Sequence, residues 1–233
     1  RQRQMCIRDS GNGAEPWKVP DLAEIPRIDL HFATEPNTTA ADGSPRFMPY
    51  RRDPQTLARP WALPGTKGLE HRVGGLEKSA HTGAISYDPA NHEEMVATRA
   101  AKVKGIAKTI PPTAVDDPSG DADVLVLGWG SAYGPITAAV RRVRARGLSI
   151  AQAHVRHLNP LPEDLGDVLR RYRQIVVPEM NTGQFAMLLR SKYLIDVKTI
   201  SRVRGLPISP VDLCDELCRH CGDSKGSDDT REA

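Results

Sequence analysis

Two hydrophobic periods alternate along the second half of the chain. The run Val124–Leu127 is short and wholly apolar, which is typical of a strand buried on both faces of a parallel sheet. Apolar residues then recur at helical spacing as a single stripe, formed by Ile136, Ala139, Val140 and Val143. Gly147 follows this stripe and is expected to end the helix.

The same alternation continues to residue 221. Further strands are predicted at 149–154, 174–177 and 197–203. Between and after them we expect a helix with an apolar stripe of Leu165, Val168, Leu169 and Tyr172, a helix at 185–194 that is apolar nearly all round and therefore buried, and a last amphipathic helix at 211–221. Strands and helices that alternate across short loops predict a three-layer α/β fold with a mainly parallel sheet.

The first half of the chain has a different character. Residues 11–64 carry nine prolines, which remove ladder donors and block helix interiors, so this stretch is expected to be an extended strap that packs on a larger body. A glycine-punctuated loop is predicted at 65–87. Asp88 then opens a helix that ends near 105–108, and the linker up to residue 122 separates this helix from the α/β domain.

Composition narrows the class of protein. With 39% hydrophobic and 26% charged residues the chain has an ordinary globular balance, and no apolar run is long enough for a membrane span. A net charge of +3, without any recognition motif, does not argue for nucleic-acid binding. We expect a cytoplasmic protein with reduced thiols. Residues 1–10 share no periodicity with the neighbouring chain and are interpreted as a non-native leader, and residues 222–233 as a disordered tail.

Four stretches carry a family resemblance. These are GLEHRVGGLEKSAHTGAISYDPANHEEMVATRAAKV, VLVLGWGSAYGPITAAV, HVRHLNPLPEDL and VVPEMNTGQFAMLLRSKYLIDV. They closely resemble the alpha subunits of 2-oxoacid:ferredoxin oxidoreductases of the 2-oxoglutarate type, over roughly Gly11–Leu217. The resemblance implies that 11–87 is the end of the pyrimidine-binding domain with a connecting segment. It also implies that 123–221 is a transketolase C-terminal-like domain, and that the chain is a C-terminal fragment.

The resemblance also implies a reaction and its partners. The complete enzyme would decarboxylate a 2-oxo acid oxidatively, pass the acyl group to coenzyme A and reduce ferredoxin. It would use thiamine diphosphate with magnesium and an iron–sulfur cluster. The family's diphosphate and cluster sites belong to the beta subunit, so we expect no catalytic residue, cofactor or metal on this fragment alone. Pyruvate and branched-chain 2-oxo acids stay open as substrates.

A glycine-rich loop leaves a second function open. Gly128, Gly130 and Gly134 follow a predicted strand and open a helix, which is the context of a dinucleotide-binding turn. A ribose-binding acid should stand about 20 residues further on. The second strand instead ends in His154, Arg156 and His157, bases that would suit a 2′-phosphate. An NADP-binding module is therefore one alternative, and a helix-capping turn packed on a partner is the other.

Several charged and polar side chains are further candidates for contacts with ligands or partner proteins. Arg141, Arg142, Arg144 and Arg146 gather on one short helix, either as a solvated face near its C-terminus or as a patch for acidic ferredoxin or coenzyme A phosphates. Three residues follow the third strand, where open α/β sheets build their sites, and either contact the partner subunit or substrate channel or cap the next helix: Glu179, Asn181 and Gln184. In the glycine-punctuated loop at 65–87, His71 and Arg72 are either candidates for interface or anion contacts or ordinary surface residues.

Three cysteines near the C-terminus are spaced like the ligands of a metal site. Cys214, Cys218 and Cys221, with His220 beside them, have a spacing that would suit an iron–sulfur cluster or zinc. The same spacing places the thiols with Leu213 and Leu217 on one helix face, where cysteine serves as a small apolar side chain. We expect this second interpretation to hold, with a metal-binding or interaction tail as the alternative.

Overall fold

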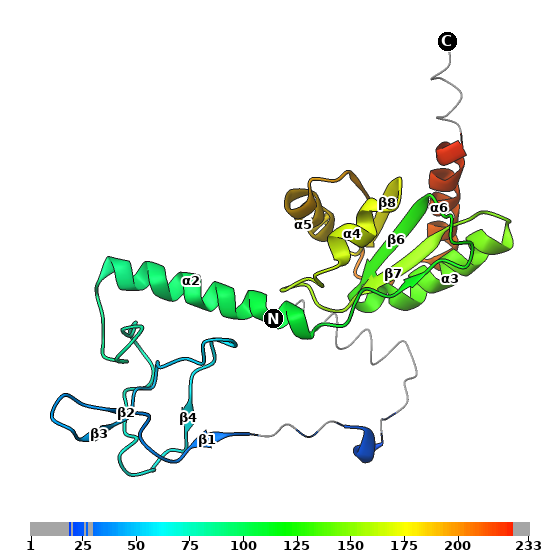
Figure 1. The fold of residues 1–233 in the computed structure, drawn as a ribbon. Helices are drawn as coiled ribbons and strands as arrows, with labels where there is room; N and C mark the ends of the chain where they lie inside the picture. Colours follow the sequence, from blue (N-terminus) through cyan, green and yellow to red (C-terminus); the bar gives the residue numbers. More distant parts are fainter. Residues whose placement is uncertain (1–18, 20, 26, 28–29, 226–233) are drawn as a thin grey trace. The chain divides into compact units, whose positions relative to one another are not determined.

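The computed structural model describes residues 19, 21–25, 27 and 30–225, which divide into two compact units (Figure 1). One unit is Pro20–Lys108, and the other contains the chain from Thr109 onward. Each is described by itself. The predicted leader at 1–10 and most of the predicted tail lie outside the described residues.

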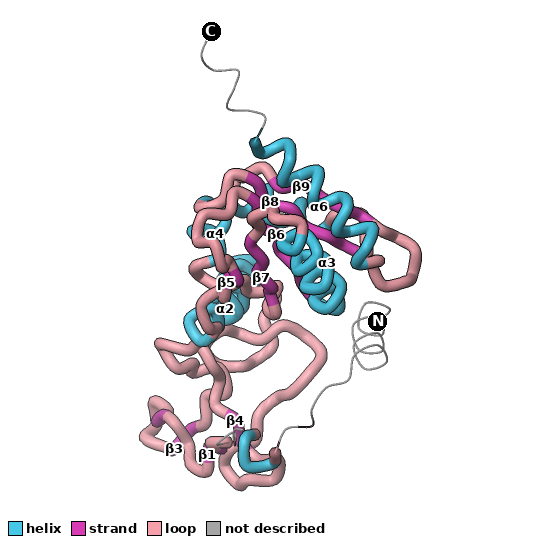
Figure 2. The backbone as a smooth tube through the Cα atoms, turned by 90° about the vertical axis from the view of Figure 1, so that its right-hand side faces the viewer, coloured by secondary structure: helices cyan, strands magenta, loops and turns pink. Residues whose placement is uncertain are grey.

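The C-terminal unit is built on a five-stranded sheet with the order β5-β7-β6-β8-β9 (Figure 2). Its strands are β5 (Val115–Asp116), β6 (Val124–Trp129), β7 (Ala151–Val155), β8 (Gln174–Glu179) and β9 (Val197–Ser201). The last four run parallel, and β5 pairs antiparallel with β7 at the edge. The mainly parallel sheet that the sequence predicts is therefore confirmed.

Helices cover both faces of this sheet (Figure 1). Helices α3 (Tyr133–Ala145) and α6 (Pro210–Lys225) pack on one face, and α4 (Leu165–Arg170) and α5 (Gln184–Tyr193) pack on the other. The predicted stripe of α3 is buried in full: Ile136, Ala139, Val140 and Val143 are at most 1% exposed. The three-layer α/β/α architecture follows from these two helical layers.

Three details differ from the sequence prediction. Helix α5 buries only one face, because Met187 and Leu188 on its other side are 54% and 43% exposed. Strand β5 lies inside the stretch predicted to be a linker, and two residues carry no periodic signal that would reveal it. Helix α6 continues to Lys225, so the chain is still helical where the tail at 222–233 was expected to begin.

The N-terminal unit contains little regular structure before its helix. Strands β1 (Phe32–Ala33) and β4 (Trp61–Ala62) pair parallel, while β2 (Thr38–Thr39) and β3 (Pro45–Arg46) pair antiparallel. Each has only two residues, as expected for a proline-rich stretch. The short 3-10 helix η1 (Leu22–Glu24) precedes them.

Helix α2 (Pro89–Gly105) begins and ends where the sequence predicts. Asp88 caps it through a bond from the Ala90 N–H, and the 3-10 turn η2 (Ile106–Thr109) follows. Of its own side chains only Met95 is buried, so the apolar positions Val96 and Val103 are left 47% and 38% exposed. Within its unit, α2 is therefore only weakly packed.

The glycine-punctuated loop at 65–87 contacts α2 through side-chain hydrogen bonds and ion pairs. The Asn91 amide accepts from the Ala80 N–H (2.8 Å) and donates to the Lys78 carbonyl (3.1 Å). Glu77 bonds His92 and, at 3.2 Å, Arg99. This loop therefore has a defined place beside the helix. None of the helices in the described part of the chain is both long and apolar enough to cross a membrane.

The two units should differ in their resistance to protease. Thr113 donates from its N–H (2.7 Å) and its hydroxyl (3.0 Å) to Asp164, which ties the start of the C-terminal unit to its helical layer. Limited trypsin digestion followed by mass spectrometry is expected to leave a fragment that begins near Thr109 and extends beyond His220, while residues 11–64 are cut first. Cleavage inside 123–220 as early as in 11–64 would contradict this prediction.

Candidate functional site

The loop after β6 needs its glycines for packing and for turning. A Cβ added at Gly128 would lie 2.7 Å from Ile136 Cδ1 and 3.0 Å from His154 Nδ1, so a side chain there collides with both neighbours. Gly130 has φ +58°, in the left-handed region that favours glycine. Among the described residues no side chain caps α3. The loop is thus a tight turn that brings helix and strand together.

Glu179 and Asn181 cap helix α5. The Glu179 carboxylate is 1% exposed and accepts from the N–H groups of Phe185 and Ala186, both at 3.0 Å. Asn181 Oδ1 accepts from the Gly183 N–H at 2.8 Å. Both side chains therefore have the capping role that was the alternative to partner contact. Gln184 is exposed at the start of the helix, and contact with a partner stays a prediction for it.

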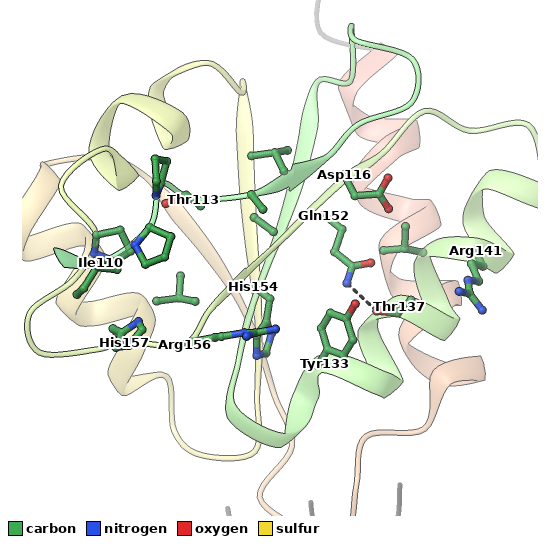
Figure 3. Close-up of a pocket in the computed structure, with 18 of the residues that line it drawn as sticks. Ile110, Thr113, Asp116, Tyr133, Thr137, Arg141, Gln152, His154, Arg156 and His157 are labelled. Atoms are coloured by element: carbon green, nitrogen blue, oxygen red, sulfur yellow. Dashed lines mark hydrogen bonds between the residues drawn. The ribbon is translucent and has the colours of Figure 1, made fainter. Parts of the chain in front are cut away.

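A cleft of about 770 Å³ lies on the α3 face of the sheet, at the β5 edge (Figure 3). We call it the β7 cleft, because residues 152–157, from this strand and just past its end, line it; Gln152 and His154 contribute its polar side chains within the strand. The intervening residues Ala151, Ala153 and Val155 belong to the core on the opposite face. The cleft stays open because β5, with two residues, is the only strand beyond β7 in the described sheet.

Helix α3 and the segment that leads into and includes β5 form the two walls of the cleft. From α3 come Tyr133, Thr137, Val140, Arg141 and Arg144, and the opposite wall is Ile110–Asp116. In Figure 3, Tyr133 lies beside His154 at the centre, Arg141 lies at one end and Arg156 and His157 at the other. The Tyr133 and His154 rings meet edge to face, with centroids 5.0 Å apart.

Two polar atoms on the floor are buried without a hydrogen-bond partner in the described structure. Gln152 is 6% exposed and donates from Nε2 to the Thr137 hydroxyl (2.7 Å), but its Oε1 has no donor. His154 Nδ1 is also buried and unpaired. Burial and the nearby positive charge of Arg156 lower the pKa of His154, so its ring is neutral at neutral pH. The sequence singled out His154, Arg156 and His157 but missed Gln152, whose only signal is a polar residue at every second position of β7.

The four arginines of α3 do not form one patch. Arg144 bonds Asp116 (2.8 Å) and the Ile150 carbonyl, and Arg146 pairs with Asp215 (2.9 Å). Arg141 lines one end of the β7 cleft, whereas Arg142 is exposed and donates to the Ala138 carbonyl. A patch for ferredoxin or coenzyme A therefore has at most two of its four predicted members without an acidic partner in the described structure.

Of the two candidate contact residues in the N-terminal unit, His71 has contacts within the unit and Arg72 does not. His71 Nδ1 lies 2.8 Å from the Leu69 carbonyl, and its ring packs on Phe47 with centroids 5.3 Å apart. Arg72 is exposed, with no bond to the described residues. An interface or anion contact stays a prediction for both.

The C-terminal cysteines belong to the core of the C-terminal unit. Cys214 and Cys221 are 0% and 3% exposed and pack with Leu213 and Leu217 beneath α3. Cys218 is half-buried and accepts a bond from Arg146 (3.4 Å). His220 contacts Gln174 (2.7 Å). Burial raises the pKa of the Cys214 thiol, which keeps it protonated. In the described part of the chain, no three His, Cys, Asp or Glu side chains are placed to hold a metal ion.

The chain is similar to a family of known proteins. Residues 122–213 match the family model for pyruvate:ferredoxin oxidoreductase core domain II. The chain is 51% identical, over 208 residues and 89% of its length, to 2-oxoglutarate oxidoreductase subunit KorA of Mycobacterium tuberculosis. It is 31% identical, over 61% of its length, to the alpha subunit of 2-oxoacid:ferredoxin oxidoreductase 1 of Aeropyrum pernix.

A solved structure agrees with these relatives. The chain matches the 2-oxoglutarate:ferredoxin oxidoreductase of Magnetococcus marinus, solved with 2-oxoglutarate, coenzyme A and succinyl-CoA bound. The TM-score is 0.69 and the identity 29%, over 79% of this chain and 32% of that one. The chain spans 30% of the length of the Mycobacterium relative and 23% of the Aeropyrum relative.

Removal of the buried cap should destabilise the C-terminal unit. Glu179→Ala leaves two buried N–H groups without an acceptor, so the free energy of unfolding is expected to fall by about 2–4 kcal/mol. Urea denaturation followed by circular dichroism measures this change. Gln184→Ala, at an exposed position of the same helix, is the control and should change it by less than about 0.5 kcal/mol. Equal effects of the two changes would rule out the capping role.

The cysteines are expected to bind no metal, because two of the three thiols are packed into the core and the helix does not wrap around a common centre. Anaerobic reconstitution with iron and sulfide, followed by elemental analysis and a visible spectrum, should give no stoichiometric iron. The control is the triple variant Cys214→Ser, Cys218→Ser, Cys221→Ser. Iron that binds the original chain and disappears in this variant would show that the thiols are ligands.

Proposed function

Since the chain belongs to the alpha-subunit family of the 2-oxoacid:ferredoxin oxidoreductases, we propose that it serves in an enzyme that converts 2-oxoglutarate and coenzyme A to an acyl-coenzyme A and reduces ferredoxin. The observation that carries this proposal is the 51% identity to the 2-oxoglutarate oxidoreductase subunit over 89% of the chain. The Magnetococcus structure supports the same substrate. The chain would act with a beta subunit in the cytoplasm.

The described residues do not fit the cofactors of such an enzyme. Thiamine diphosphate needs a magnesium ion held by oxygen ligands, and an iron–sulfur cluster needs converging thiolates. The described part of the chain has no three side chains placed for a metal ion, and Cys214 and Cys221 are enclosed by the core. We therefore assign both cofactors to other parts of the complex and no chemical step to this chain.

The part of this chain would be to hold a partner. The exposed side of α5 combines Gln184 with Met187 and Leu188, which are apolar and about half exposed. Apolar side chains grouped beside a polar rim are typical of protein contacts. Helix α5 is held rigidly, because Glu179 and Asn181 cap it and Phe185 and Leu189 fix its inner face. This side of the domain is our candidate contact with the beta subunit.

The chain alone is expected to turn over no 2-oxo acid, because the proposal assigns both cofactors to other parts of the complex. The measurement is ferredoxin reduction with 2-oxoglutarate, coenzyme A and thiamine diphosphate, without a beta subunit. Pyruvate replaces 2-oxoglutarate in a parallel assay. Turnover in either assay above a protein-free blank would overturn the assignment of roles.

A hybrid enzyme provides the positive control. Residues 11–217 of this chain replace the matching region of the Mycobacterium relative, which is then produced with its beta subunit. The hybrid is expected to reduce ferredoxin with 2-oxoglutarate, whereas the same relative with the region deleted should not. A hybrid that folds and assembles but is inactive would contradict the proposed function.

A further inference from the structure

A short turn in the N-terminal unit brings three arginines together. The Leu57 N–H donates to the Asp53 carbonyl at 2.9 Å, and this bond reverses the chain between Arg52 and Arg59. Arg51, Arg52 and Arg59 all line one open pocket of about 460 Å³, which we call the arginine pocket. The other residues that line it are Asn37, Asp53, Ala58 and Pro60.

Two of the arginines are held in place by an aromatic ring. The guanidinium carbon of Arg59 lies 4.5 Å from the centroid of the Tyr50 ring, and that of Arg52 lies 5.7 Å from it. Arg52 Nη1 also donates to the Leu57 carbonyl at 3.0 Å. Leu57 has φ +57°, a left-handed conformation that costs a leucine free energy and that recurs where proteins hold ligands. The two guanidinium groups are therefore positioned by the fold itself.

The charge of Arg52 is partly desolvated without a compensating acid. Its Nε is covered and has no hydrogen-bond partner in the described structure. Burial, and next the charge of Arg59, lower the pKa of Arg52. Among the described residues, the three arginines contact backbone carbonyls and the Tyr50 ring but no carboxylate. An anion at the exposed part of the Arg52 guanidinium would offset this cost through its charge, without touching the covered atom.

The acids nearby are committed to other bonds. Asp53 Oδ1 accepts from the Gln55 N–H (3.0 Å), the Thr56 N–H (2.7 Å) and the Thr56 hydroxyl (2.8 Å). The bonds from Thr56 and Gln55 lower the pKa of Asp53, which stays ionised. Arg51 and Arg52 also line a second pocket, whose carboxylate, Glu94, lies 3.8 Å from His81. Three guanidinium groups and one carboxylate leave the arginine pocket with two uncompensated positive charges, which matches a doubly charged anion.

The remaining lining favours a small anion over a nucleotide. Guanidinium groups match the oxygens of phosphate through paired N–H donors. Tyr50 offers no free face to a base, because Arg59 and Arg52 lie over its ring. The Asn37 amide already accepts from the Met48 N–H (2.7 Å) and donates to the Met48 carbonyl (3.0 Å), so it has little left for a base or a sugar.

We propose that Arg51, Arg52 and Arg59 form a binding site for a small phosphate dianion, either inorganic phosphate or the phosphate group of a small ester that has no nucleoside base. Arg52 and Arg59, which Tyr50 positions, bind the phosphate oxygens, and Arg51 adds charge at the rim of the pocket. The site concerns binding by this chain alone. It is therefore independent of the reaction proposed above.

Isothermal titration calorimetry on the full chain, at an ionic strength kept constant with chloride, tests the site with four probes: inorganic phosphate, glycerol phosphate, acetate and 5′-AMP. A phosphate is expected to bind saturably with a Kd of about 1 mM or below. Acetate carries one charge and should bind at least about tenfold more weakly. The tighter of inorganic phosphate and glycerol phosphate identifies the source. The base should add nothing, so 5′-AMP is expected to bind no more tightly than glycerol phosphate.

Matched variants locate the binding. Arg59→Gln removes an exposed guanidinium and is expected to weaken phosphate about tenfold. Arg46→Gln, which is also exposed but lies outside the pocket lining, should change nothing. Tyr50→Leu should weaken phosphate because the guanidinium groups lose their support, whereas Tyr50→Phe keeps the ring and should bind like the original chain. Circular dichroism of each variant checks that the fold is retained.

Four results would overturn the proposal. The first is the absence of saturable phosphate binding at millimolar concentration, and the second is equal affinity for acetate and phosphate. The third is an equal effect of Arg46→Gln and Arg59→Gln, which would indicate only a general attraction by positive charge. The fourth is binding of 5′-AMP about tenfold more tightly than glycerol phosphate, which would indicate a nucleotide site instead. Each result leaves the hybrid-enzyme assay unaffected.

Discussion

The burial of β6 on both faces is the constraint on which the C-terminal unit depends. Val124–Leu127 are all 0% exposed, with Val124 and Val126 in the core beneath α3 and α6 and Leu125 and Leu127 in the core beneath α4 and α5. Removing such side chains from water stabilises by roughly 1.5–3 kcal/mol each. A strand of this kind needs helices on both sides, and the parallel pairing of β6, β7, β8 and β9 brings their carboxyl ends to one edge of the sheet.

The local pattern of apolar residues therefore predicted the positions of most helices and strands in this unit, but only in part which of their faces are buried. The stripe of α3 and the apolar runs of β6 and β8 were predicted correctly because burial imposes a period on the sequence. Strand β5 was missed, since two residues have no period, and α5 was predicted to be fully buried because Met187 and Leu188 are apolar although they face outward. Whether a helix face is exposed depends on which other parts of the fold cover it. The sequence of the helix itself does not contain this information.

The candidate site was predictable to a similar degree. The positions of Glu179 and His154 at strand ends followed from the alternation of elements, but their bonds did not. Whether Glu179 contacts a partner or caps a helix depends on its distance to the N–H groups of Phe185 and Ala186, which is a matter of tertiary structure. Likewise, Arg144 and Arg141 are equivalent in the sequence. Only the antiparallel pairing of β5 brings Asp116 to Arg144 and leaves Arg141 without an acid among the described residues.

Two surfaces of this domain lie on opposite faces of the sheet. Helix α5, the candidate contact with a beta subunit, packs on one face, while the β7 cleft opens beside α3 on the other. The sheet between them is closely packed, with β6 and β8 buried on both sides. A partner on α5 would therefore neither cover the cleft nor compete for its arginines. Occupation of the two surfaces is therefore sterically compatible in one domain, and coupling between them would have to pass through the ends of β6 and β8, at Trp129 and Glu179, which lead into α3 and α5.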